Sequence, residues 1–192
     1  MDKLTKAINF AAIKHRDQRR KDEFATPYIN HPIEVMNLLA QAGVTDVDIL
    51  CAAVLHDTIE DTQTTVYELL AEFGENVTTM VRECTDDKLL PKIQRKKLQI
   101  EHVEGASVGA KLVKLGDKIS NMSGLKTHPP KSWTEAEITG YVIWCYAVYM
   151  GMKGINEQLD KQILEIFDSF GVLALSVGEF GDKLRMYYKN IS

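Results

Sequence analysis

Four polar side chains lie where the pattern of residues 46–61 leads one to expect an apolar helix face. At helical periodicity, the arc that begins with Ile49 and Val54 continues into acidic and imidazole groups. Unpaired carboxylates directed into a core would each cost several kcal/mol, whereas a divalent cation accepts both carboxylate and neutral imidazole ligands. A hydrated cap at a solvent-exposed helix end is the alternative. The four residues are His56, Asp57, Glu60 and Asp61.

A second segment, residues 108–125, has the same character. Its apolar stripe faces away from a polar stripe that contains Lys114, Asp117 and Asn121. The stripe is either the wet face of an amphipathic helix, or Asp117 is a further metal ligand with Lys114, Lys118 and Asn121 near a bound anion.

His31 is another candidate ligand, because it precedes Pro32 at a predicted helix start, where a side chain is held firmly and can face a cleft. A capping or core role is the alternative. No site role is predicted for His15, His102 or His128.

Positive charge comes from two segments outside these stripes. Arg19, Arg20 and Lys21 lie in a polar loop, which taken alone is typical of a solvated turn. The run from Lys92 to Lys97 is predicted to be a solvated helix face.

Helices must position these residues, because helical spacing recurs along most of the chain and no alternating run is long enough for a sheet. We predict an all-α fold of about eight to ten helices. A domain is expected over residues 1–170, followed by a tail, 171–192, that is either docked or disordered. The predicted helices cover about 4–16, 32–43, 46–61, 64–74, 76–84, 91–102, 108–125, 134–153 and 155–170.

Composition narrows the class of protein. The 192 residues are 45% hydrophobic and carry a net charge of −4, which suits one domain with a real core and argues against general nucleic-acid binding. Three widely spaced cysteines without a CxxC pair favour a reduced compartment. No signal-type or membrane-spanning apolar run is found, so we expect a cytoplasmic protein without a membrane partner.

The order of His31, His56-Asp57 and Asp117 along separate helices resembles the histidine–aspartate (HD) phosphohydrolase superfamily. Five motifs extend the resemblance to the hydrolase domain of RelA/SpoT-type proteins, closest to the small stand-alone metazoan SpoT homologues. It covers about residues 4–170. The motifs are Arg19-Arg20-Lys21-Asp22, Thr26-Pro27-Tyr28-Ile29-Asn30-His31-Pro32, His56-Asp57-Thr58-Ile59-Glu60-Asp61-Thr62, Thr85-Asp86-Asp87-Lys88 and Lys111-Leu112-Val113-Lys114-Leu115-Gly116-Asp117-Lys118.

The resemblance implies an all-helical hydrolase that removes the 3′-pyrophosphate from guanosine 3′,5′-bis(diphosphate), with one Mn²⁺ per chain or another divalent metal. It implies a catalytic acidic pair, Glu60 and Asp61, of which Glu60 would be the general base. The implied metal ligands are His31, His56, Asp57 and Asp117. The implied nucleotide-site residues are Arg20, Lys21, Tyr28, Lys118 and Asn121, and Lys114 adds a further cation beside the acidic pair.

One departure and two alternatives accompany this hypothesis. Where the family tends to read Leu-Arg-Asp-Leu after Asn121, this chain has Met122-Ser123-Gly124-Leu125, so a charged pair beside the site is missing. The ribose 2′-phosphate of NADPH is chemically close to a ribose 3′-pyrophosphate and is an alternative substrate. A nucleotide sensor without turnover is the second alternative. The partner is in each case a small nucleotide, and the oligomeric state is not readable from the sequence.

Overall fold

The computed structural model describes residues 2–191, and the all-α prediction is confirmed for this range. Apart from one isolated bridge between Arg19 and Pro27, these residues form only helices and their connections. In chain order the helices are α1 (Asp2–Lys14), α2 (Asn30–Gln41), α3 (Val47–Leu55), α4 (Thr58–Asp61), α5 (Val66–Phe73), α6 (Glu75–Cys84), α7 (Lys92–Val103), α8 (Val108–Ser123), α9 (Glu135–Tyr149), α10 (Glu157–Ser169), the 3-10 helix η1 (Val172–Ala174) and α11 (Val177–Asn190).

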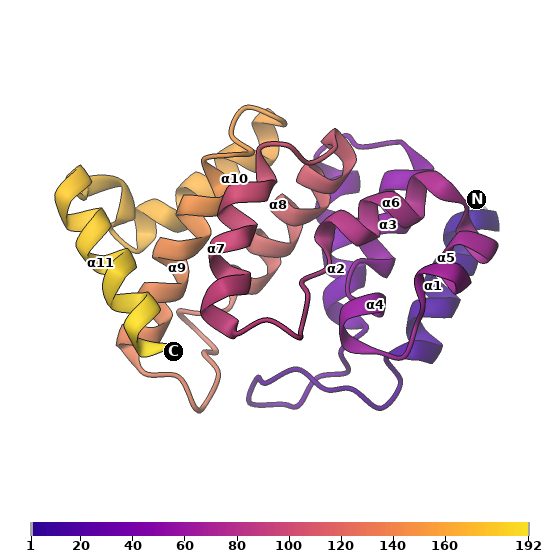
Figure 1. Ribbon diagram of the computed structural model, residues 1–192, viewed down its shortest axis with the longest axis horizontal. Helices are drawn as coiled ribbons and strands as arrows, with labels where there is room; N and C mark the ends of the chain where they lie inside the picture. Colours follow the sequence, from indigo (N-terminus) through magenta and orange to yellow (C-terminus); the bar gives the residue numbers. More distant parts are fainter. Residues whose placement is uncertain (1, 192) are drawn as a thin grey trace.

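Helix α8 is the central element of the fold. Figure 1 shows it in the middle of the molecule, with α1 and α5 at one end and α11 at the other, and it packs against α2, α3, α6, α9 and α10. Gly116 allows a close approach to α2, because a Cβ atom there would lie 2.5 Å from Leu39 Cδ1. Lys114 and Lys118 are only 7% and 5% exposed, so the polar stripe of α8 is not a wet surface face.

The single helix predicted over residues 46–61 is wrong, because the chain breaks into α3 and α4 at His56 and Asp57. Side chains compete with the backbone for the last carbonyls of α3. His56 Nδ1 lies 2.8 Å from the Ala53 carbonyl oxygen, and Thr58 Oγ1 donates to the Leu55 carbonyl at 2.7 Å. The break lifts His56 and Asp57 out of a regular helix and directs them toward α8.

The segment between α1 and α2, predicted as a loop, closes on itself through backbone hydrogen bonds. The Arg20 amide donates to the Thr26 carbonyl at 2.8 Å, and the Tyr28 amide donates to the Gln18 carbonyl at 3.0 Å. These bonds fix the backbone of Arg20 and Tyr28 in the segment that precedes α2.

Of the two possibilities for the C-terminal segment, the structure has the docked one. Helix α11 begins with a capping box at Ser176 and packs against α9. Tyr187 is buried there, and a Cβ atom on Gly140 would meet its ring at 2.6 Å. A domain boundary at residue 170 stays a prediction.

Within residues 2–191, no helix is long and apolar enough to cross a bilayer. Cys51 and Cys145 are buried free thiols, as expected for small core residues, while Cys84 is half-buried and lines a cavity.

Candidate active site

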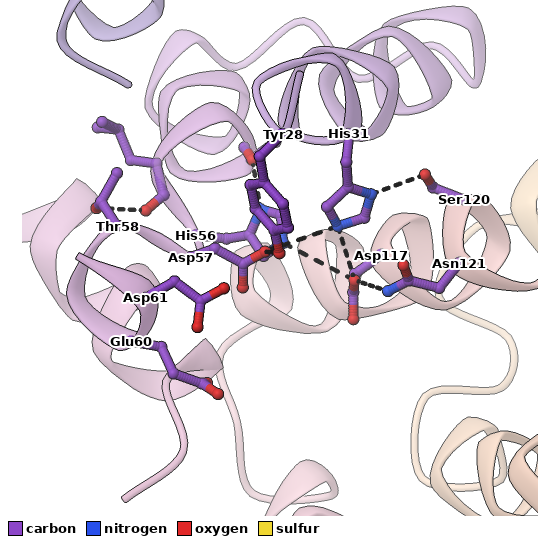
Figure 2. A network of polar contacts seen from close by, with 12 residues as sticks. Tyr28, His31, His56, Asp57, Thr58, Glu60, Asp61, Asp117, Ser120 and Asn121 are labelled. Atoms are coloured by element: carbon purple, nitrogen blue, oxygen red, sulfur yellow. Dashed lines mark hydrogen bonds and ion pairs between the residues drawn. The ribbon is translucent and has the colours of Figure 1, made fainter. Parts of the chain in front are cut away.

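Three of the four predicted metal ligands converge from separate elements. His31 comes from α2, His56 from the break after α3, and Asp117 from α8 (Figure 2). Their ligating atoms all lie within 4.8 Å of one another. The Nε2 atoms of His31 and His56 lie 3.2 and 3.8 Å from Asp117 Oδ1.

Hydrogen bonds fix which nitrogen of each imidazole faces this group. His56 Nδ1 donates to the Ala53 carbonyl, which can only accept. His31 Nδ1 lies 2.9 Å from Ser120 Oγ, whose own proton goes to Glu34 Oε2 at 2.7 Å. The network therefore assigns the Nδ1 proton to both rings and leaves both Nε2 atoms directed at Asp117, as metal-binding histidines require.

Asp57 lies against both imidazoles but outside the group of three. Its Oδ2 atom is 3.0 Å from His56 Nε2 and 3.7 Å from His31 Nε2, and it accepts a hydrogen bond from the Tyr28 hydroxyl at 2.6 Å. The assignment of Asp57 as a fourth ligand stays a prediction. The Tyr28 hydroxyl thus holds Asp57, while the role of Tyr28 in the nucleotide site stays a prediction.

The electrostatics of this group fit a divalent cation. Burial lowers the pKa of His56, but the carboxylates of Asp57 and Asp117 overcome this and raise it to about 9. Burial raises the pKa of Asp117, yet Lys118 and His31 hold it well below its usual value. His56 Nε2 is buried without a hydrogen bond of good geometry. The raised pKa of His56 thus reflects a local demand for positive charge, which a bound metal ion would meet in place of the proton.

The predicted acidic pair lies on α4 beside this group. Glu60 Oε2 accepts a hydrogen bond from the Asp86 amide at 2.9 Å. Burial raises the pKa of Glu60 to about 7, against that hydrogen bond and with help from the negative charges of Asp86, Asp57 and Asp61. A carboxyl group with a pKa near neutrality suits a general base.

Asp61 is held by residues that the sequence analysis did not assign to the site. Its Oδ2 atom accepts from Gln18 Nε2 at 2.9 Å, and Lys88 pairs with Oδ1. Gln18 is in turn held by His15, whose Nδ1 lies 2.7 Å from Gln18 Oε1. His15 is buried, and its ring lies 5.0 Å from that of Tyr28. It therefore supports the site, and no helical pattern signals this.

Two adjoining cavities border the site and contain all the predicted nucleotide-site residues. The smaller, about 260 Å³, is lined by the acidic pair, by Lys114 and Lys118, and by α7. The larger, about 740 Å³, is lined by Arg20, Lys21 and aromatic residues that include Trp133. Four residues line both cavities: Tyr28, Asp61, Asn121 and Tyr141.

The prediction that Lys92–Lys97 is a solvated face is wrong for Arg95 and Lys96, which are partly buried. Both line the smaller cavity, as does the exposed Lys92, because α7 packs against α9 with this edge toward α8. The departure after Asn121 affects the other cavity, since Ser123 and Gly124 line the larger one. Ser123 donates to the Ile119 carbonyl within its own helix.

The fold is shared with known proteins. Residues 7–147 match the HD domain family. The Homo sapiens and Drosophila melanogaster proteins named guanosine-3′,5′-bis(diphosphate) 3′-pyrophosphohydrolase MESH1 are 48% and 42% identical to this chain, covering 88% and 89% of it and 95% and 96% of their own lengths. A solved structure of a metazoan orthologue of SpoT, described as hydrolysing ppGpp, is 42% identical and has a TM-score of 0.87, covering 90% of this chain and 97% of that one.

Proposed function

This chain belongs to the HD-domain family, and on that premise we propose that it is a metal-dependent hydrolase that removes the 3′-pyrophosphate from guanosine 3′,5′-bis(diphosphate), giving GDP and pyrophosphate. The observation that carries the proposal is the meeting of His31, His56 and Asp117 beside Glu60, at the junction of two cavities that both contain cationic side chains.

His31, His56, Asp57 and Asp117 would hold the divalent cation, for which we propose Mn²⁺. Mixed nitrogen and oxygen ligands suit this ion. When bound, the cation polarises a phosphoryl oxygen and lowers the pKa of water. Ser120 and the Ala53 carbonyl keep the two imidazoles in the tautomer that binding needs. We propose the cytoplasm as the location, because free thiols are typical of a reducing compartment.

Glu60 takes the proton from the attacking water. Its carboxyl is half-buried beside the ligand group, and its hydrogen bond from the Asp86 amide orients one oxygen and leaves the other available. Asp61 orients the water, since Gln18 and Lys88 fix its own position. Both members of the acidic pair are present and held in place, which argues against a sensor without turnover.

The larger cavity takes the nucleoside. Arg20 and Lys21 supply positive charge there, and Arg20 Nη1 is positioned by a 3.2 Å hydrogen bond to Asn121 Oδ1. Lys118, paired with Asp117 Oδ2 at 2.8 Å, and Lys114 stabilise phosphate oxygens from the α8 side.

The direct test is to incubate the purified, Mn²⁺-loaded protein with guanosine 3′,5′-bis(diphosphate) and to measure GDP and pyrophosphate. We expect stoichiometric release of both products. Absence of release from protein whose metal content is confirmed would overturn the proposal. A parallel assay with NADPH, measuring phosphate release and kcat/KM, ranks the alternative substrate.

A further inference from the structure

The α7 wall of the smaller cavity carries two partly buried, positively charged side chains that form no ion pair within residues 2–191. Arg95 Nε is buried without a hydrogen-bond partner. Lys96 Nζ lies 3.4 Å from the centroid of the Trp144 ring and 5.2 Å from that of Tyr141, so aromatic faces and not carboxylates are its neighbours. A buried donor left without a partner is costly unless a ligand satisfies it.

The α8 wall adds a similar group. Lys114 is 7% exposed, and within residues 2–191 its ammonium group has neither a hydrogen bond nor an ion pair. Lys118, one turn further along α8, differs because Asp117 pairs with it. Lys118 Nζ also lies 4.8 Å from the Trp144 ring centroid, so the ammonium groups of Lys96 and Lys118 share one indole.

Apart from the Asp117–Lys118 pair, none of the acidic residues that line this cavity, Glu60 and Asp61 included, forms an ion pair with the cations on its walls within residues 2–191. Asp57 and Asp117 are engaged by the imidazoles, and both oxygens of Asp86 accept hydrogen bonds from Gln99 at 2.8 Å. Burial and the neighbouring charge of Lys118 lower the pKa of Lys96 to about 7, against the weaker opposing effect of the Asp86 and Asp117 carboxylates.

We propose that Arg95, Lys96 and Lys114 form a subsite for a diphosphate group, the pyrophosphate that the reaction releases. The inference rests on the proposed function and extends it to α7, which no part of that function used. Three cations without carboxylate partners on two walls suit an anion of higher charge than a phosphate monoester, which carries about −2 near neutral pH. The subsite therefore favours a 3′-diphosphate over a ribose 2′-monophosphate.

Lys97 offers a matched control on the same helix. It is exposed, lies outside both cavities, and places its Nζ 5.4 Å from the Tyr188 ring on α11. Replacing it removes one charge from α7 without changing the cavity wall.

The test compares Arg95→Met, Lys96→Met and Lys114→Met with Lys97→Met and the wild type, all loaded with Mn²⁺ at one total metal concentration, so that chelation by pyrophosphate affects every sample equally. Binding of inorganic pyrophosphate is measured by calorimetry, with inorganic phosphate as the second probe. We expect each of the three cavity variants to bind pyrophosphate about 10-fold to 100-fold more weakly. Phosphate binding should fall less, and Lys97→Met should match the wild type.

Kinetics give the second arm. In the three cavity variants, KM for guanosine 3′,5′-bis(diphosphate) should rise by more than KM for NADPH. If the variants bind pyrophosphate as the wild type does while the wild type hydrolyses the guanosine substrate, the subsite is wrong and the proposed function stands. If no protein hydrolyses that substrate but the variants still lose pyrophosphate binding, the proposed function fails and the subsite stands. Lys114→Met, on a different helix, keeps the test valid if an α7 variant misfolds.

Discussion

The metal-ligand group and the α7 wall of the smaller cavity differ in how their polar side chains are held. On the α2 and α8 wall, which borders the larger cavity, His31 is held by Ser120 and Ser120 by Glu34, so the ligand group is organised by bonds within the chain. On the α7 wall of the smaller cavity, Arg95 and Lys96 have no carboxylate partner among the residues that the structure describes. The polar groups of the first wall have their partners before a ligand binds, whereas the cations of the second find a partner only in a bound anion. The chain thus keeps a preorganised metal group beside a cation cluster whose charge only an anion can balance.

Glu60 lies beside the preorganised wall, and its replacement should have the largest effect. Glu60→Gln keeps the size of the side chain but removes the base, so kcat should fall by about 10²-fold to 10⁴-fold. Metal content, measured by elemental analysis, should stay unchanged, because Glu60 is not among the three converging ligands. Turnover within threefold of the wild type would show that another group accepts the proton.

The pH dependence sharpens the role of the same residue. Since burial and nearby carboxylates raise the pKa of Glu60 to about 7, its basic form is lost as the pH falls through that value. Below that pKa we expect kcat/KM to fall about tenfold per pH unit. A bound cation lowers the pKa of Glu60, so this acid limb of the pH–rate profile should move to lower pH. The check is a pH–rate profile from pH 5 to pH 9. If the profile of Glu60→Gln keeps an acid limb of the same slope, a group other than Glu60 is responsible for that limb.

Ser120 tests whether the preorganised wall depends on its internal hydrogen bonds. Ser120→Ala removes the acceptor for His31 Nδ1 and should weaken Mn²⁺ affinity by about 10-fold to 100-fold. Ser123→Ala, one turn along α8, is the matched control, because Ser123 bonds only the Ile119 carbonyl among the described residues. Metal titration by calorimetry measures both. Equal affinities in the two variants would mean that packing alone orients His31.

The smallest effect expected is on stability, and it has opposite signs at two neighbouring lysines. Lys114→Met removes an unpaired buried charge, so the melting temperature of the metal-free protein should rise by about 2–4 °C. Lys118→Met leaves Asp117 without its cation and should lower it. Differential scanning calorimetry without added phosphate compares the two. A fall in both variants would contradict the view that Lys114 lacks a partner.

Local patterns predicted the all-α fold, because helical spacing and breaker residues act within one segment. His31, His56 and Asp117 lie together in the structure, and the expectation that they would rested on the order of motifs and not on helical spacing. The break after α3 escaped prediction, since the apolar pattern continues through it and only side-chain bonds to backbone carbonyls end the helix.

Local sequence patterns could not predict the residues that support the site, because the side chains they bond are distant in sequence. Gln18 and Asp61 are 43 residues apart, and His31 and Ser120 are 89 apart. The misjudged α7 run shows the same limit. A charged stretch is typical of a solvated face unless another helix encloses it, and α9 encloses this one with aromatic side chains that lie some 45 or more residues further along the chain.

The position of Trp144 beneath Lys96 and Lys118 also gives the protein an intrinsic optical reporter. Indole emission responds to charge placed at its face, so an anion that draws these ammonium groups away should change the fluorescence of Trp144. The chain has two tryptophans, and the other, Trp133, lines the larger cavity. One tryptophan thus lies behind two lysines of the smaller cavity and the other lines the larger one, so replacing either by phenylalanine would let the filling of the two cavities be followed separately, in real time and without a label.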